Sequence, residues 1–238
     1  GHYVLLLEAQ SQVGGQVVLA ARASERQAEL LGITQWLASE IQLLGVELRV
    51  NTVAETQQIL SEKPDVVITA TGGWTEKPPL SGGEDLVFTT SEVLSGEVKI
   101  PENVLIFDDH GSERALSVAE YLQSHGAKDI EIITPDRLIG HDLSATTGPA
   151  YLGMLYTKGV KLTPDHRLIE VKRDKTKIQA VFRNEYTSAT IHRETHLVVV
   201  ENGSSPNDEL FKELRESSVN DGVTDLEALR IGKAQPRT

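Results

Sequence analysis

The sequence predicts an α/β protein built on parallel β-sheet, and three observations support this class. Short apolar runs alternate along the chain with longer segments of helical periodicity, as in β-α-β units. The order strand, turn, helix, strand occurs once in the first half and again from residue 103. The composition, with 39% apolar and 24% charged residues, is typical of a globular protein, and 238 residues suffice for one large or two ordinary domains.

The first half alternates predicted strands and helices. Residues 2–9, "HYVLLLEA", predict a buried strand, and residues 24–44 place apolar side chains at helical spacing up to Gly45, which predicts a helix. The alternating segment "VELRVNT" predicts a second strand, and "AETQQILSEK" a short helix. The segment "PDVVITATGG" predicts a third strand, with Pro64 at its start, where a missing N–H costs little.

The second half repeats the alternation after a predicted linker. Residues 74–100 are rich in Pro, Gly, Ser and Glu, which is typical of a linker. The segments that follow predict a strand at "NVLIFDD", a helix at "GSERALSVAEYLQSHG", a strand at "DIEIITP" and a helix at "PAYLGMLYTKG". Residues 160–184 predict β-hairpins, "THLVVVENG" a buried strand and "NDELFKELRES" a helix. The shared order of elements indicates two related nucleotide-binding folds.

Charge and composition exclude several classes of partner. The formal net charge of −12 disfavours nucleic acid and anionic membrane surfaces, because both require clustered cations. The longest apolar runs are far shorter than the roughly 20 residues of a membrane span. The sequence contains no cysteine, so it supplies neither disulfides nor thiolate ligands for a metal or an iron–sulfur cluster. We therefore expect a cytoplasmic protein without nucleic acid or membrane partners.

The strand at the start of the chain ends on an acid. Glu8 follows the apolar run, and a carboxylate at this place can accept hydrogen bonds from both hydroxyls of an adenosine ribose. The alternative is an ordinary surface glutamate at a strand end. Gly14 and Gly15 follow, and they either let a ligand approach the backbone closely or form a simple turn.

Three further turns could carry chemistry. The segment "TATGG", Thr69–Gly73, leaves an apolar strand as a small-residue turn, which suits either a pyrophosphate or a tight strand exit. The segment "VVVENGSSPND" repeats that arrangement around Gly203. The segment "DDHGSERALSVAE" stands where a dinucleotide fold needs a glycine-rich loop, and its two adjacent acids would repel a pyrophosphate. A metal site from these acids and His110 is one alternative, and a helix start stabilised by acids is the favoured one.

The ordered motifs resemble a known family. The segments "GHYVLLLEAQSQVGGQVVLAARA", "PDVVITATGG", "VLIFDDHGSERALSVAEYLQSHGA" and "VVVENGSSPNDELFKEL" are similar to the C-terminal region of NADH:flavin oxidoreductases. This family includes 2,4-dienoyl-CoA reductase and the trimethylamine, dimethylamine and histamine dehydrogenases. The resemblance covers nearly the whole chain and is strongest to the amine dehydrogenase and N-demethylase branch.

The resemblance implies two Rossmann-like, glutathione-reductase-type domains of three layers, one inserted in the other. Residues 1–97 and 190–238 would form an FAD- or ADP-binding domain, and residues 98–189 an inserted NAD(P)-type domain. The parent would carry FMN and a 4Fe-4S cluster in an N-terminal barrel, form a homo-oligomer and pass electrons to an electron-transfer flavoprotein. We expect the chain to be a fragment that lacks the barrel, the first strand and its glycine loop, with weak or absent nucleotide binding and no activity of its own.

The family's nucleotide-binding positions are carried over residue by residue. The matching cofactor-binding residues are Glu8, Gly14, Gly15, Gln16, Val53, Ala70, Thr71, Gly72 and Gly232. No catalytic or metal-binding residue is predicted. Two departures stand out, because Lys233 replaces an aspartate of the family and the acids Asp108 and Asp109 replace the glycine loop that NAD(P)H requires. The sequence therefore predicts no nicotinamide binding.

Two classes of function remain open. In the first, the chain is the nucleotide-binding portion of a flavin-dependent oxidoreductase that acts on an amine, an N-methyl compound or, with NADPH, an enoyl thioester. In the second, it is a non-catalytic scaffold that keeps the flavoprotein fold without a cofactor, which the departure at Lys233 favours. Titration of the full-length protein with ADP and FAD separates them.

Overall fold

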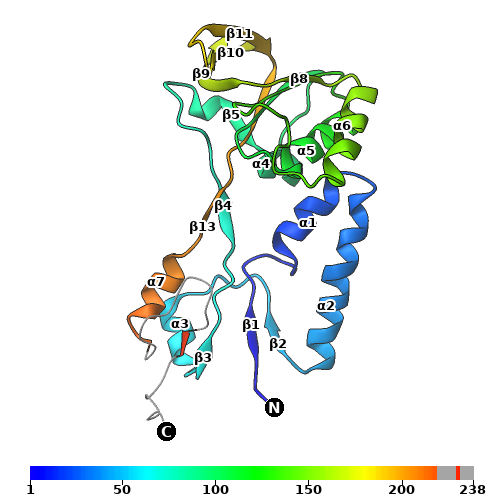
Figure 1. Ribbon diagram of the computed structural model, residues 1–238. Helices are drawn as coiled ribbons and strands as arrows, with labels where there is room; N and C mark the ends of the chain where they lie inside the picture. Colours follow the sequence, from blue (N-terminus) through cyan, green and yellow to red (C-terminus); the bar gives the residue numbers. More distant parts are fainter. Residues whose placement is uncertain (219–228, 231–238) are drawn as a thin grey trace. The chain divides into compact units, whose positions relative to one another are not determined.

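The computed structural model describes residues 1–218 and the two-residue strand 229–230 (Figure 1). The chain divides into two compact units. The first contains residues 1–15, 32–74 and 205 onward, and the second contains residues 16–31 and 75–204. No helix in the described part of the chain is long and apolar enough to cross a membrane.

The first unit contains a parallel strand pair at its N-terminal end. Strand β1 (Leu5–Leu7) pairs with β2 (Glu47–Arg49) so that Leu6 lies opposite Leu48. Helix α2 (Leu31–Leu43), which follows the 3-10 turn η1 (Gln27–Leu30), connects them. This order of strand, helix and parallel strand confirms the α/β prediction for this half of the chain.

The rest of the first unit packs around a small apolar core. Strand β3 (Val66–Val67) pairs antiparallel with β14 (Leu229–Arg230). Helix α3 (Thr56–Ser61) contributes Ile59 to the core, and helix α7 (Glu209–Arg215) contributes Phe211 and Leu214. The described strands of this unit form separate two-stranded sheets: β1 pairs with β2, β3 pairs with β14, and no described strand joins these two sheets. The described strand pairs confirm the α/β class of this unit, and its three-layer arrangement stays a prediction.

The second unit is built on a five-stranded parallel sheet of order β5-β12-β6-β7-β8. Strand β6 shows why both faces are covered: Val104 and Ile106 belong to one core cluster, while Leu105 and Phe107 belong to the other. Successive side chains of a strand point to opposite faces, so an unbroken apolar run requires two buried faces. The strands are β5 (Val87–Thr89), β6 (Asn103–Asp108), β7 (Asp129–Ile133), β8 (Lys161–Thr163) and β12 (Leu197–Glu201).

Helices cover one face of this sheet and an antiparallel meander covers the other, which gives three layers (Figure 1). The helices are α4 (Thr90–Ser95), α5 (Glu113–Ser124) and α6 (Thr147–Thr157), and α1 (Gly15–Arg22) contributes Leu19 to the same cluster. The meander consists of β9 (His166–Asp174), β10 (Lys177–Asn184) and β11 (Thr190–Thr195). The predicted hairpins of residues 160–184 thus correspond to β8, β9 and β10.

The predicted linker at residues 74–100 is wrong in its second half. It contains the 3-10 turn η2 (Glu84–Leu86), strand β5 and helix α4. Strand β5 forms because it pairs parallel with the distant β12, and Val87 is buried in the core. Helix α4 begins with a capping box, in which Thr89 and Glu92 bond each other's backbone N–H groups, and this signal was present in the sequence.

The compact units do not end where the predicted domains end. The predicted divisions were 97/98 and 189/190, whereas contacts divide the chain at 74/75 and 204/205 and place residues 16–31 with the second unit. The physical reason is that β5 and β12 belong to the five-stranded sheet. Strand β4 (Gly73–Thr75) pairs with β13 (Ser204–Pro206), where the chain passes between the units.

Candidate functional site

Most residues predicted to bind the nucleotide lie in the first unit. Seven of the nine belong to it: Glu8, Gly14, Gly15, Val53, Ala70, Thr71 and Gly72. Gln16 belongs to the second unit, where its side-chain oxygen accepts a hydrogen bond from Arg114 at 3.5 Å. Gly232 and Lys233 lie outside the described residues.

Glu8 lies at the carboxyl end of the parallel strand pair. Its backbone N–H donates to the carbonyl O of Arg49 at 2.9 Å, and its carbonyl O accepts from Thr52 N at 2.9 Å. A further bond joins Asn51 N to Gln10 O at 2.8 Å. The loops that leave β1 and β2 therefore remain bonded to each other beyond the strands, which holds Glu8 beside residues 49–52.

The Glu8 side chain is half-buried and already has one partner. Its Oε1 accepts from the backbone N–H of Gln10 at 2.8 Å, which fixes the carboxylate over the loop after β1. The described part of the chain supplies no hydrogen bond to the other carboxylate oxygen. Val53, the residue after Thr52, is 69% exposed, so its apolar surface is open to a ligand. An acid and an apolar side chain in these places suit the ribose and the base of an adenosine.

The glycine pair forms the turn before helix α1. Gly14 has a φ of 124° and Gly15 a φ of 46°, and both values lie in the region that other residues rarely adopt. A Cβ on Gly15 would meet no atom within 4 Å, so the backbone conformation, and not crowding, requires glycine there. This turn is compatible with both predictions made for the pair, a turn and a close approach to a ligand.

The segment predicted to meet the pyrophosphate is bonded to another part of its own unit. The Thr71 hydroxyl donates to the carbonyl O of Asn207 at 2.5 Å, and Asn207 N donates to the carbonyl O of Gly72 at 2.9 Å. A Cβ on Gly73 would lie 2.5 Å from Ser205 O, which shows how closely the two backbones run. Neither the Thr71 hydroxyl nor the Gly72 carbonyl is therefore available as an unpaired group.

The described residues suit only part of the cofactors that the family resemblance implies. Glu8 and Val53 suit the adenosine half of ADP or FAD, whereas the Ala70–Gly72 segment offers no cation to a pyrophosphate. The chain has no cysteine, so its residues do not fit a cysteine-ligated iron–sulfur cluster. No group of three or more His, Asp or Glu side chains in the described residues is placed to bind a metal ion.

The acids of the second unit occupy the turn between β6 and α5. Asp108 is fully buried, and its Oδ1 accepts from the backbone N–H groups of His110 at 3.1 Å and Gly111 at 2.9 Å. Asp109 pairs with Arg167 at 2.7 Å. Ser112 is the residue that caps helix α5. The acids therefore bond the turn that leads into α5, and the favoured prediction that they stabilise the helix start stays a prediction.

Sequence reasoning missed two side chains that close this turn. His141 packs against Gly111, where an added Cβ would lie 2.1 Å from its Nδ1, and the ring is 2.8 Å from Asp136 and 3.3 Å from Asp142. Arg167 joins Asp109 to Glu185, the latter at 2.6 Å. Only the position of Asp136, just after strand β7, could have drawn attention to the cluster.

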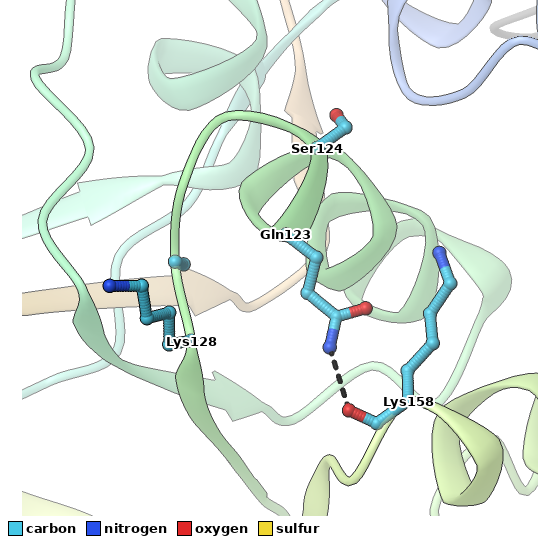
Figure 2. Close-up of a pocket in the computed structure, with 5 residues that line it drawn as sticks. Gln123, Ser124, Lys128 and Lys158 are labelled. Carbon is cyan, nitrogen blue, oxygen red and sulfur yellow. Dashed lines mark hydrogen bonds between the residues drawn. The ribbon is translucent and has the colours of Figure 1, made fainter.

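A shallow hollow lies at the other end of α5 (Figure 2). Gln123 donates to the carbonyl O of Lys158 at 3.1 Å, as the dashed line in Figure 2 shows, and Lys128 pairs with Glu102 at 2.5 Å. None of the predicted cofactor residues lines it.

Burial raises the pKa of Asp108 to about 6, against the opposing effect of its backbone hydrogen bonds. This buried acid lies at the β6–α5 turn and does not line the hollow.

The fold is that of Rossmann-type flavoprotein domains, as comparison with solved structures shows. The structure matches thioredoxin reductase of Lactococcus lactis with a TM-score of 0.61 at 15% identity, over 94% of this chain and 82% of that one. It matches a 2-naphthoyl-CoA reductase with a TM-score of 0.79 at 24% identity, over 89% and 31%. Histamine dehydrogenase from Rhizobium sp. 4-9 gives 0.77 at 17% identity, over 90% and 34%. These identities support the fold alone.

Sequence comparison is more specific. The chain is 41% identical to N,N-dimethylglycine/sarcosine dehydrogenase of Chromohalobacter salexigens, over 99% of this chain and 35% of that protein. It is 39% identical to a probable N-methylproline demethylase of Rhizobium meliloti, over 99% and 34%. No family model matches the chain. The chain thus spans about a third of the length of these relatives.

The chain is homologous to the C-terminal part of these flavin-dependent dehydrogenases and demethylases. The resemblance found in the sequence motifs is confirmed.

Proposed function

We propose that this chain is the nucleotide-holding C-terminal region of an FMN- and 4Fe-4S-dependent oxidoreductase of the amine dehydrogenase or N-demethylase type. The first unit holds ADP or FAD, and the oxidation of an amine or N-methyl substrate takes place at the FMN of the N-terminal barrel. The barrel is the partner of these domains, electrons leave to an electron-transfer flavoprotein, and the full-length protein is a homo-oligomer. The chain alone has no catalytic residue.

The observation that carries this proposal is Glu8 at the carboxyl end of the β1–β2 pair. Ligands of α/β sheets bind beyond the carboxyl ends of parallel strands, and an acid there accepts hydrogen bonds from ribose hydroxyls. The Gln10 N–H at 2.8 Å holds the carboxylate in one orientation. The identity to an N,N-dimethylglycine/sarcosine dehydrogenase supports the class of substrate.

Replacing Glu8 by Gln tests the binding role. We expect the affinity of the full-length protein for ADP or FAD to fall about tenfold, because a hydrogen bond to a charged group contributes about 1.5–3 kcal/mol, part of which a neutral amide retains. The measurement is calorimetric titration with ADP and FAD. Glu55→Gln is the matched control, since Glu55 is also in the first unit and its side chain makes no capping bond to α3. Equal affinities of both variants and the unchanged protein would contradict the role of Glu8.

The second unit is proposed to bind no nicotinamide nucleotide. Asp108 and Asp109 are anionic groups at the turn where a pyrophosphate would lie, and His141 packs against Gly111 of the same turn. We expect the full-length protein to show no NADPH-driven turnover and no NADPH binding below millimolar concentration. Tight NADPH binding would instead favour the alternative of an enoyl reductase of the 2,4-dienoyl-CoA reductase type.

The alternative of a scaffold without cofactor also has an observation in its favour. The Thr71 hydroxyl and the Gly72 carbonyl are bonded to Asn207 and do not face a ligand unpaired. Purification of the full-length protein decides between the two. ADP or FAD released on denaturation supports the oxidoreductase proposal, whereas the absence of both, together with no binding in titration, supports the scaffold.

A further inference from the structure

Two acidic side chains lie side by side inside the second unit. Asp108 ends β6 and Glu201 ends β12, and they are register partners on these parallel strands. In-register side chains of neighbouring strands point to the same face, and such strands are about 4.8 Å apart. Both residues are 0% exposed. The sheet therefore brings two carboxyl groups together where water does not reach them.

Each carboxyl group has one oxygen that is bonded and one that is not. Asp108 Oδ1 accepts from the two backbone N–H groups of the turn, and Glu201 Oε2 accepts from the Thr90 hydroxyl of α4. Asp108 Oδ2 and Glu201 Oε1 are buried and have no hydrogen-bond partner among the described residues. A buried acceptor without a donor destabilises the folded protein, and more so when it is charged. A proton on one of these oxygens removes that cost.

The charged groups around the pair do not balance two negative charges. From α5, Arg114 lies 3.7 Å from Glu201 Oε1. From the turn, His110 is adjacent to Asp108, while the Asp109 carboxylate is directed to Arg167 of β9. One guanidinium therefore faces two carboxyl groups. Burial is the first cause of the raised pKa of Asp108, and the charge of Glu201 adds to it.

We propose that Asp108 and Glu201 hold one proton between them, which the folded protein retains in mildly acidic solution where exposed carboxylic acids are ionised. Asp108 carries this proton, because Glu201 faces the Arg114 guanidinium and accepts a hydrogen bond from the Thr90 hydroxyl. Loss of the proton at higher pH places two negative charges at the ends of β6 and β12. The side chains then separate, and the β6–α5 turn that Asp108 holds becomes less protected.

Infrared spectroscopy tests the protonation directly. At a pH of about 5.5 we expect a C=O stretching band of a protonated carboxylic acid that disappears as the pH is raised to about 8. The band should be absent from Asp108→Asn and should disappear at lower pH in Glu201→Gln, where the like charge is removed. Asp174→Asn, an exposed acid at the end of β9, is the control and should leave the band unchanged.

A second measurement on the unaltered protein keeps the proposal testable if a variant fails to fold. Carboxyl carbon NMR of aspartate-labelled protein should show one aspartate that titrates well above the others. Hydrogen exchange of the His110 and Gly111 amides, corrected for intrinsic rates, should show protection that falls over the same pH range. The proposal is overturned if all aspartates titrate near pH 4, or if the infrared band persists in Asp108→Asn.

Discussion

Replacing Gly83 by Ala should destabilise the second unit by roughly 3 kcal/mol, because backbone strain and a steric clash add. Gly83 has a φ of 85°, which strains any residue with a Cβ. The added Cβ would also lie 1.9 Å from the carbonyl O of Val171 and 2.7 Å from its carbon. Val171 is buried in β9, so we expect the loop that contains Gly83, and not the strand, to move away.

The movement would break specific contacts. The loop bonds β9 through Ser81 N to Ile169 O at 2.9 Å and through Val171 N to Gly82 O at 3.0 Å. Urea unfolding, with hydrogen exchange read on β9 and β10, measures the effect in the second unit. Gly82→Ala is the matched control, because its nearest atom would be Glu170 Oε1 at 4.0 Å, and we expect a change within about 1 kcal/mol. Equal unfolding midpoints for the two variants would show that the close approach is absent in solution.

Replacing Asp108 by Asn should change how the stability of the second unit depends on pH. The pKa of Asp108 is raised to about 6 in the folded protein from its ordinary value of 3.8. The folded state therefore binds the proton more tightly than the unfolded state, and the contribution of Asp108 to stability is fully present below about pH 4. It falls as the pH rises toward 6, by roughly 3 kcal/mol in total, since each pKa unit corresponds to about 1.4 kcal/mol.

The Asp108→Asn variant does not lose stability in this way as the pH rises. Its Oδ1 still accepts from His110 and Gly111, and its amide supplies donors where Asp108 Oδ2 has no partner among the described residues. We expect Asp108→Asn to be more stable than the unaltered protein at about pH 8 by up to roughly 3 kcal/mol, and similar to it at about pH 4. Urea midpoints across this range measure the difference, with Asp174→Asn as control. A constant difference at every pH would contradict a proton-linked effect.

Local sequence patterns predicted most of the elements of the second unit. The apolar run of β6, the helical spacing of α5 and the run of β12 each lie within the segment that predicted them. Their periodicity is a property of neighbouring residues, so it can be read without the fold. Helix α1 and strand β11 were not predicted, because α1 buries few residues and the edge strand β11 contains a single apolar residue, Ile191.

Only one part of the candidate site could be predicted from the sequence, namely the position of Glu8 at the end of a strand. Glu8 does lie at the carboxyl end of a parallel pair, as its position after an apolar run indicated. The bonds of Thr71 and Gly72 to Asn207 could not be predicted, since they join segments far apart in the chain. The nucleotide-binding role of the other predicted residues stays a prediction.

The sequence alone determined the class of the protein: short apolar strands, helical spacing, an acid after the first strand and a run of motifs shared with amine dehydrogenases. The tertiary structure decided which residues act together. Asp108 and Glu201 meet because β6 and β12 pair in register, and β5 exists because β12 bonds it from the far end of the chain. Such pairings depend on which strands become neighbours in the sheet, and no local pattern of residues encodes that choice.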